Sequence, residues 1–199
     1  MDWTTEGTTR GAFLSRGAKG GLALVAGGSV LAATTGAAFG AATTDTDIAK
    51  LAATAELLAI DFYTRALGTK KFTGAEEAYM AAALQNEKDH YKALAGVLKS
   101  AAPKGLHFTY PAGTFANGKS IGKLGQALET AFVGAYLGAV TALKSNDLKG
   151  VAATIGANES RHLAILSNIA AGTIVSGPSF PKSFTAAQAT KAVTPFIKM

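Results

Sequence analysis

The sequence contains no cysteine, and this absence excludes several classes of chemistry at once. Disulfide bonds, thiolate zinc sites, cysteine-bound iron–sulfur clusters and cysteine nucleophiles all require the thiol group. Any bound metal would therefore have to be held by oxygen and nitrogen atoms.

Charged residues are also scarce, at 16% of the 199 positions, whereas 48% are hydrophobic. Disordered proteins have the opposite balance, so we expect one folded domain with a sizeable core, together with a leader or tail. The net charge is +6, but the lysines are scattered and no basic run is interleaved with aromatic residues. We therefore expect no nucleic-acid partner.

The N-terminal part of the chain has the layout of an export signal. Residues 20–44 contain no charge and consist mainly of Ala, Gly and Val, and a basic segment that includes Arg10 and Arg16 precedes them. A basic start, an apolar segment and small residues at a cleavage site are typical of secretory signals. We predict that residues 1–42 form an export signal or leader. The mature protein would then reside in the periplasm, the cell envelope or the extracellular space.

The route of export and the fate of the leader stay open. Phe13 and Leu14 match the apolar pair of a twin-arginine signal, but Gly11 follows Arg10, so the full arginine pair is absent. The apolar stretch is roughly long enough to span a membrane, although small residues make it a weak span. An uncleaved anchor helix, or a helix packed on the domain, is the alternative to cleavage. Only an uncleaved leader would connect this protein to a membrane.

The rest of the chain predicts an all-α fold of four helices. Gly68 is suited to end the first helix, Thr73 and Glu76 form the pattern of a capping box before the second, and Ser145 is a suitable cap for the fourth. Apolar residues recur with helical spacing in four segments, which we place at residues 46–67, 74–99, 120–144 and 147–171.

A long connection separates the second predicted helix from the third. Residues 100–119 are rich in Gly and Pro and are numerous enough to run the length of a bundle. The sequence therefore predicts two helical hairpins joined by one crossover, within a bundle domain at residues 43–176. Residues 177–199 are predicted to be a C-terminal tail that packs on the bundle, with a short helix at 185–193.

Carboxylates and imidazoles interrupt the apolar faces of all four predicted helices. The second and fourth helices each carry the motif Asn-Glu-x-x-His within their apolar stripes, and the first and third helices each carry one Glu in a corresponding place. A spacing of three residues places Glu and His on one helix face, so both can reach one site. The candidate metal ligands are Glu56, Glu87, His90, Glu129, Glu159 and His162.

The same residues indicate an internal duplication. Glu56 and Glu129 are 73 positions apart, and 72 positions separate the first Asn-Glu-x-x-His motif from the second. Four ionised carboxylates in a core would repel one another and lose their hydration unless cations neutralised them. Two divalent metals supply the matching charge, and carboxylates with one imidazole per metal suit iron or manganese.

Other interpretations apply to the individual residues. A single Glu or His on an apolar face is more often a hydrogen-bonded core residue than a ligand, and a descendant protein can keep the whole set in a structural role. Tyr63 and Tyr136 each follow a Glu of the set by seven residues, and each is either a plain core aromatic or a hydrogen-bond donor to a metal-bound carboxylate. His107 belongs to no motif. We interpret Asp61 and Asp89 as surface partners of nearby Arg and Lys residues.

With these motifs the chain resembles the ferritin-like di-iron carboxylate superfamily, and specifically exported bacterial ferritin-like domain proteins of the desiccation-related type. The resemblance covers about residues 46–171 and implies a ferritin-like four-helix bundle. It implies that Glu56 and Glu129 are terminal ligands, that Glu87 and Glu159 bridge two metals, and that His90 and His162 each bind one. A rubrerythrin is disfavoured because a chain without cysteine cannot hold a rubredoxin-type iron centre. A haem-bearing cage ferritin is disfavoured because export would separate it from the cytosolic iron pool.

The resemblance implies two iron ions, or alternatively two manganese ions, and dioxygen or hydrogen peroxide as the reaction partner. The leading hypothesis is a di-iron oxidoreductase of the ferroxidase or peroxidase-like type, with manganese catalase chemistry as a variant. The alternative is a non-catalytic envelope or stress-protection protein that retains a structural metal site. The sequence leaves open whether the protein forms a homo-oligomer.

The predicted leader can be tested directly. If it is an export signal, mass spectrometry of the native protein will find an N-terminus near residues 41–43, because the small residues of a signal-peptidase site lie there. An intact chain starting at Met1 and confined to the cytosol would contradict both cleavage and export.

Overall fold

The computed structural model describes residues 44–175 and 177–198, so the predicted leader at 1–42 lies outside the described residues. Within the described part the secondary structure is helical apart from one isolated bridge between two extended segments. The long helices are α2 (Asp45–Gly68), α3 (Gly74–Leu98), α4 (Gly118–Ala142) and α5 (Asn146–Ala171). The shorter ones are η1 (Lys99–Ala101), α6 (Ala186–Val193) and η2 (Thr194–Phe196).

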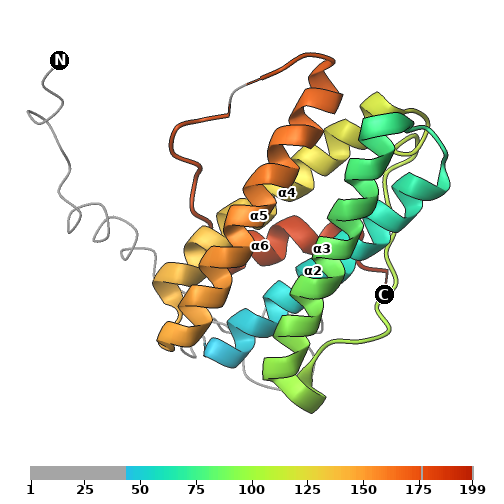
Figure 1. Ribbon diagram of the computed structural model, residues 1–199. Coiled ribbons are helices and arrows are strands. Elements are labelled where there is room, and N and C mark those ends of the chain that lie inside the picture. Colours follow the sequence, from blue (N-terminus) through green and yellow to red (C-terminus); the bar gives the residue numbers. More distant parts are fainter. Residues whose placement is uncertain (1–43, 176, 199) are drawn as a thin grey trace, which may run out of the picture.

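The four long helices form a bundle of two hairpins, which confirms the predicted fold class (Figure 1). Helix α2 packs against α3, and α4 packs against α5. After α3 the chain runs back along the bundle through residues 99–117 before α4 begins, and this is the predicted crossover (Figure 1). None of the described helices is both long and apolar enough to cross a membrane.

The helix ends follow from local capping, with one correction to the sequence analysis. Thr73 precedes α3 as expected, but its side chain makes no capping hydrogen bond, so the predicted capping box is wrong. Gly74 begins α3 with a φ of 57°, and this left-handed conformation directs the chain differently from an ordinary helix start. A complete capping box occurs instead at the start of α2, between Thr44 and Asp47.

The start of α2 is also bound to the turn between α4 and α5. The carboxylate of Asp45 accepts hydrogen bonds of 2.8 Å from the backbone N–H groups of Lys144 and Ser145. These two bonds lower the pKa of Asp45 below its usual value. The contact joins the first hairpin to the second at one end of the bundle.

Two apolar clusters fill the bundle, one toward each end. One contains Phe62, Tyr63 and Leu166, and the other contains Leu94, Tyr136 and Ile155. The predicted ligands lie on the same four helices between these clusters, and all of them except the half-buried His90 are buried. The fold therefore places polar side chains in the middle of an otherwise apolar core.

The C-terminal tail crosses the bundle. Helix α6 packs against α4 and α2, and the backbone N–H of Phe184 donates a hydrogen bond of 2.8 Å to the carbonyl of Gly134. Further on, Phe108 of the crossover and Ile197 of the tail form an antiparallel bridge. The N–H of Thr109 donates to the carbonyl of Phe196 at 2.7 Å. The tail thus joins the crossover to the hairpins.

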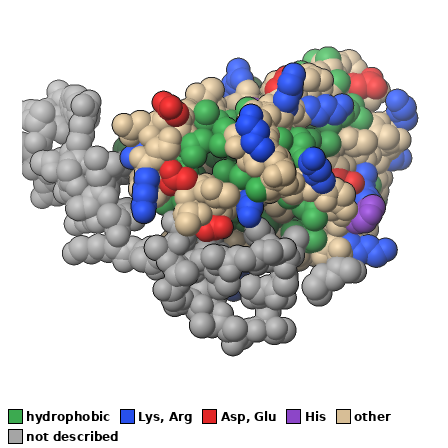
Figure 2. Space-filling model, turned by 90° about the horizontal axis from the view of Figure 1, so that it is seen from below, with side chains coloured by type: hydrophobic (Ala, Val, Ile, Leu, Met, Phe, Trp, Pro, Cys, Tyr) green, Lys and Arg blue, Asp and Glu red, His purple; other side chains and the backbone are tan. Residues whose placement is uncertain are grey.

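The face of the molecule viewed in Figure 2 has no concentrated patch of basic side chains among the described residues. Lys and Arg side chains are spread over this face, and hydrophobic side chains are exposed between them (Figure 2). The cationic side chains visible on this face are therefore dispersed.

Glycine permits the close approach of the tail to α4. A Cβ added at Gly138 would overlap the carbonyl oxygen of Phe184, whereas a Cβ at Gly150 in α5 would meet nothing within 4 Å. We predict that Gly138→Ala lowers the free energy of unfolding by about 1–3 kcal/mol, because the tail must shift away from α4.

The control is Gly150→Ala, the same change in open space. It removes only the helix penalty of glycine and is expected to stabilise the protein by about 0.5–1 kcal/mol. Thermal unfolding of both variants, followed by circular dichroism, makes the comparison. Equal melting temperatures for the two variants would contradict a steric role for Gly138.

Candidate metal centre

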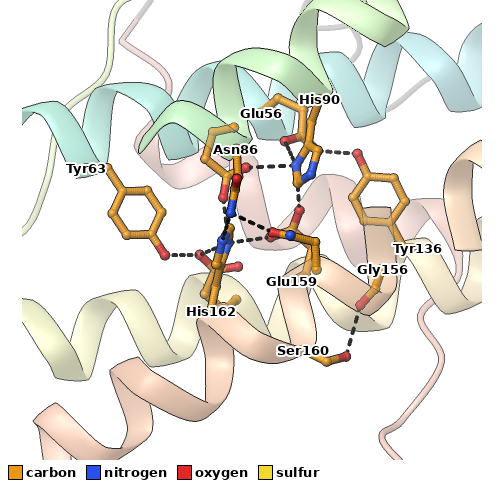
Figure 3. A network of polar contacts seen from close by, with 12 residues as sticks. Glu56, Tyr63, Asn86, His90, Tyr136, Gly156, Glu159, Ser160 and His162 are labelled. Carbon is orange, nitrogen blue, oxygen red and sulfur yellow. Dashed lines mark hydrogen bonds and ion pairs between the residues drawn. The ribbon is translucent and has the colours of Figure 1, made fainter. Parts of the chain in front are cut away.

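The structure brings all six predicted ligands into one cluster in the middle of the bundle (Figure 3). Helices α2 and α4 each contribute one Glu, and α3 and α5 each contribute the Glu and His of an Asn-Glu-x-x-His motif. The spacing of three residues in each motif directs both side chains inward from one helix face. The cluster consists of Glu56, Glu87, His90, Glu129, Glu159 and His162.

Three carboxylates surround the imidazole of His90. Its Nδ1 atom lies 3.0 Å from Glu159 Oε1, 3.3 Å from Glu56 Oε2 and 3.4 Å from Glu87 Oε2. These three Glu residues come from three different helices. One nitrogen and three oxygens therefore converge on a common point.

The imidazole of His162 has an equivalent environment. Its Nδ1 atom lies 2.7 Å from Glu87 Oε1, 3.2 Å from Glu159 Oε2 and 3.8 Å from Glu129 Oε1. In each of the two groups the candidate ligand atoms all lie within 4.8 Å of one another. The internal duplication of the sequence is thus also a duplication of the site.

Glu87 and Glu159 belong to both groups. Each directs one carboxylate oxygen toward His90 and the other oxygen toward His162. Glu56 approaches only His90, and Glu129 approaches only His162. Two carboxylates therefore face both imidazoles and two face only one, while the bridging and terminal roles that the resemblance implies stay a prediction.

The cluster is almost completely shielded from water. Each of the four Glu residues is at most 2% exposed, and His162 is 1% exposed. The side chain of His90 is the most accessible, at 13%. Among the described residues no Lys or Arg forms an ion pair with these carboxylates. Burial without a cationic side chain is unfavourable for four carboxylates unless protons or metal ions neutralise them.

The pKa values of the two unshared carboxylates and of Glu87 are shifted in opposite directions. Burial raises the pKa of Glu56 and of Glu129 well above the usual value, and repulsion from Glu87 and from Glu159 adds to the effect. Burial also opposes ionisation of Glu87. The neighbouring imidazoles of His162 and His90 outweigh it, so the pKa of Glu87 is lowered to about 2.

The carboxylates in turn hold protons on both imidazoles. Burial by itself lowers the pKa of a histidine, but Glu159, Glu56 and Glu87 outweigh it and raise the pKa of His90 to about 12. Glu159 and Glu87 likewise raise the pKa of His162 to about 9. In the absence of a metal, protons therefore neutralise part of the carboxylate charge.

Two tyrosines close the cluster on opposite sides (Figure 3). The hydroxyl of Tyr63 donates a hydrogen bond of 2.6 Å to Glu129 Oε1, and the hydroxyl of Tyr136 donates to Glu56 Oε1. Burial raises the pKa of both phenols, and the carboxylates that accept these bonds raise it further. Each tyrosine thus binds the unshared Glu of the other hairpin, and not the Glu that precedes it by seven residues.

The donor set fits a metal better than it fits hydrogen bonding alone. Among the buried side-chain atoms without a hydrogen-bond partner in the described structure are five oxygens of the four Glu residues. His90 Nδ1 also lacks hydrogen-bond geometry, although carboxylates lie close to it. Buried polar atoms are normally satisfied, and hard oxygen donors with one imidazole per group match iron or manganese.

Two neighbours of the cluster had no predicted role. Asn86 Nδ2 lies 3.2 Å from His162 Nε2 and 3.3 Å from Asn158 Oδ1, so α3 and α5 also meet through the Asn of each motif. The repeated Asn was visible in the sequence and is the signal that could have identified Asn86. The hydroxyl of Tyr79 is buried without a hydrogen-bond partner, and its ring packs edge-on against His162. No repeat marks Tyr79.

The remaining polar residues lie outside the cluster. Asp61 forms the predicted surface ion pair with Arg65, at 2.7 Å, and also accepts a hydrogen bond from Tyr110. Asp89 accepts from Gln85, and it pairs with no cation among the residues that the structure describes. His107 is exposed in the crossover. None of these residues contributes a candidate ligand.

Comparison with known protein families agrees with the geometry. A sequence profile of the ferritin-like domain matches residues 44–172, which contain all four long helices and all six candidate ligands. The chain belongs to the ferritin-like domain family. The resemblance to the ferritin-like superfamily is thereby confirmed, while the exported, desiccation-related subtype stays a prediction. A search of curated proteins gives no significant match to this ferritin-like chain.

Metal loading of this ferritin-like domain should release protons. The raised pKa values, about 12 for His90 and about 9 for His162, keep both imidazoles protonated at pH 7 in the metal-free protein, and a metal ligand must lose its proton. We predict that Mn(II) binding releases about two protons per chain, one from each imidazole, and tightens as pH rises, since fewer protons then compete.

Titration calorimetry in two buffers of different ionisation enthalpy measures this release. The variant with His90→Ala and His162→Ala serves as the control, because it lacks both imidazoles and therefore the protons that they would release. Mn(II) binding without proton release, or with an affinity independent of pH between 6 and 8, would contradict the assignment.

Proposed function

We propose that this ferritin-like protein binds two iron ions in the cluster and oxidises Fe(II) with dioxygen or hydrogen peroxide. One observation carries the proposal: Glu87 and Glu159 each direct one oxygen to each of the two imidazoles. A single metal ion does not require a carboxylate to face two ways. Two ions that share both carboxylates account for the arrangement.

Charge balance favours iron in its oxidised state. Glu56, Glu87, Glu129 and Glu159 carry four negative charges when ionised, which matches two Fe(II) ions. Two Fe(III) ions carry more positive charge and are stabilised more strongly by the same buried carboxylates. The ligand set therefore favours the loss of one electron from each iron.

The proposed reaction is balanced with iron as the substrate. Two Fe(II) ions lose one electron each, and one dioxygen molecule accepts both electrons and two protons to leave as hydrogen peroxide. When hydrogen peroxide is the oxidant, it accepts two electrons and two protons, its O–O bond breaks, and two water molecules form. Each ion would have four protein donors, which leaves room for the oxidant.

The surrounding residues would hold the ligands in position. Tyr63 and Tyr136 donate hydrogen bonds to Glu129 and Glu56, which fixes the orientation of the two unshared carboxylates. The amide nitrogen of Asn86 lies 3.2 Å from His162 Nε2, so Asn86 would help to hold the orientation of this imidazole.

The biological setting that we propose is the cell envelope or the exterior, as in ferritin-like proteins of the desiccation-related type. Its support is the uncharged segment at residues 20–44 behind a basic start. In that setting the oxidation of Fe(II) would limit the iron available to reactive oxygen chemistry. The same donor set would also accept manganese.

Metal content is the first test of the proposal. The purified domain should bind about two iron or manganese ions per chain, and Glu87→Ala or Glu159→Ala should remove most of this capacity, because each residue would serve both ions. Glu77→Ala is a matched control, since Glu77 lies exposed on the same helix as Glu87. Metal analysis by mass spectrometry gives the counts, and equal content in Glu87→Ala and Glu77→Ala would refute the site.

Iron oxidation is the second test. Two equivalents of Fe(II) are added under nitrogen, and near-ultraviolet absorbance is followed after exposure to air or peroxide. We expect Fe(III) to form faster than in buffer and expect the variant with His90→Ala and His162→Ala to be slower, because each ion loses its imidazole. If the native protein binds two ions but oxidises them no faster than buffer, the cluster has a structural role.

A further inference from the structure

A small apolar cavity lies beside the metal cluster, between α2, α4 and α6. Its volume is about 30 Å³. Helix α6 closes one side of it with Ala189 and Val193, which are 3% and 4% exposed. The lining consists of Ile48, Leu51, Ala52, Ala55, Ala131, Phe132, Ala135, Tyr136, Ala139, Ala189 and Val193.

The chemistry of the lining disfavours water. A buried water molecule normally makes two to four hydrogen bonds, and every side chain of the lining except Tyr136 is a hydrocarbon. The hydroxyl of Tyr136 already donates to Glu56. The volume is roughly twice the 10–15 Å³ that one water requires, so the cavity suits a small molecule that needs no hydrogen bonds.

Tyr136 belongs to both the cavity and the cluster. The ring of Tyr136 forms part of the cavity wall, and the hydroxyl of the same residue contacts Glu56. On the opposite helix Ala55 lines the cavity and directly precedes Glu56 in the chain. A molecule in the cavity would therefore lie next to Tyr136, the residue that donates a hydrogen bond to Glu56.

We propose that this cavity is a binding site for a diatomic apolar gas, and that dioxygen occupies it before it reaches the cluster. The use of dioxygen rests on the proposed function, whereas the binding itself depends only on the cavity. Hydrogen peroxide would not use this site, because it would lose its hydrogen bonds on entry. The C-terminal tail thus acquires a role, since α6 supplies one wall.

Dioxygen itself is the probe for binding. In the full chain without added metal, the methyl groups of Ala52, Ala55 and Ala135 should show paramagnetic relaxation under dioxygen pressure that is absent under nitrogen. Ala189→Val places extra methyl groups in the cavity and should remove most of this relaxation. Ala187→Val is the matched control, because Ala187 lies on the same helix and does not line the cavity.

A second variant tests the site by enlarging the cavity instead of filling it. Val193→Ala enlarges the cavity and should increase the relaxation, because the site gains volume. Relaxation at these methyl groups no stronger than at methyl groups of exposed alanines such as Ala153 would overturn the proposal.

The rate of iron oxidation separates the gas site from the proposed function. Ala189→Val should slow oxidation by dioxygen several-fold and leave oxidation by hydrogen peroxide unchanged, with Ala187→Val like the native protein in both. Equal slowing with both oxidants, or no slowing with dioxygen, would refute a role in access. A protein that binds dioxygen at the cavity but does not oxidise iron would retain the gas site and refute the proposed function.

Discussion

The burial of four carboxylates around two imidazoles is the constraint on which the rest of this structure depends. Such a cluster is unfavourable in an apolar core unless its charge is neutralised and its geometry is fixed. Each long helix supplies at least one candidate ligand, so the four must keep a definite register. In the metal-free protein, protons on His90 and His162 supply part of the neutralisation, because the carboxylates raise the pKa values of both imidazoles.

The two hairpins are held together by contacts that cross between them. Tyr63 of α2 binds Glu129 of α4, and Tyr136 of α4 binds Glu56 of α2. Asn86 of α3 reaches His162 of α5, and at the end of the bundle Asp45 binds the turn between α4 and α5. The two hairpins carry the same motifs, but each of the two groups of candidate ligands contains residues from both hairpins.

The sequence was sufficient to predict the helices and the six candidate ligands because both depend on local spacing. A period of 3.6 residues fixes which side chains share a face, and the motif at Glu87 and His90 is a property of one helix. The partners of Tyr63 and Tyr136 depend on how two hairpins pack, and spacing within a helix does not contain that information. The capping box expected at Thr73 failed because Gly74 adopts a left-handed backbone that composition does not reveal. The approach of Phe184 to Gly138 likewise involves residues distant in the chain.

The proposed function requires two metal ions that share Glu87 and Glu159. The decisive measurement is anomalous X-ray diffraction from crystals soaked in Mn(II), recorded near the absorption edge of manganese. We predict two anomalous peaks roughly 3.5–4 Å apart within the bundle, both in contact with Glu87 and Glu159, one beside His90 and one beside His162. A single peak, or peaks confined to the surface of the protein, would contradict it.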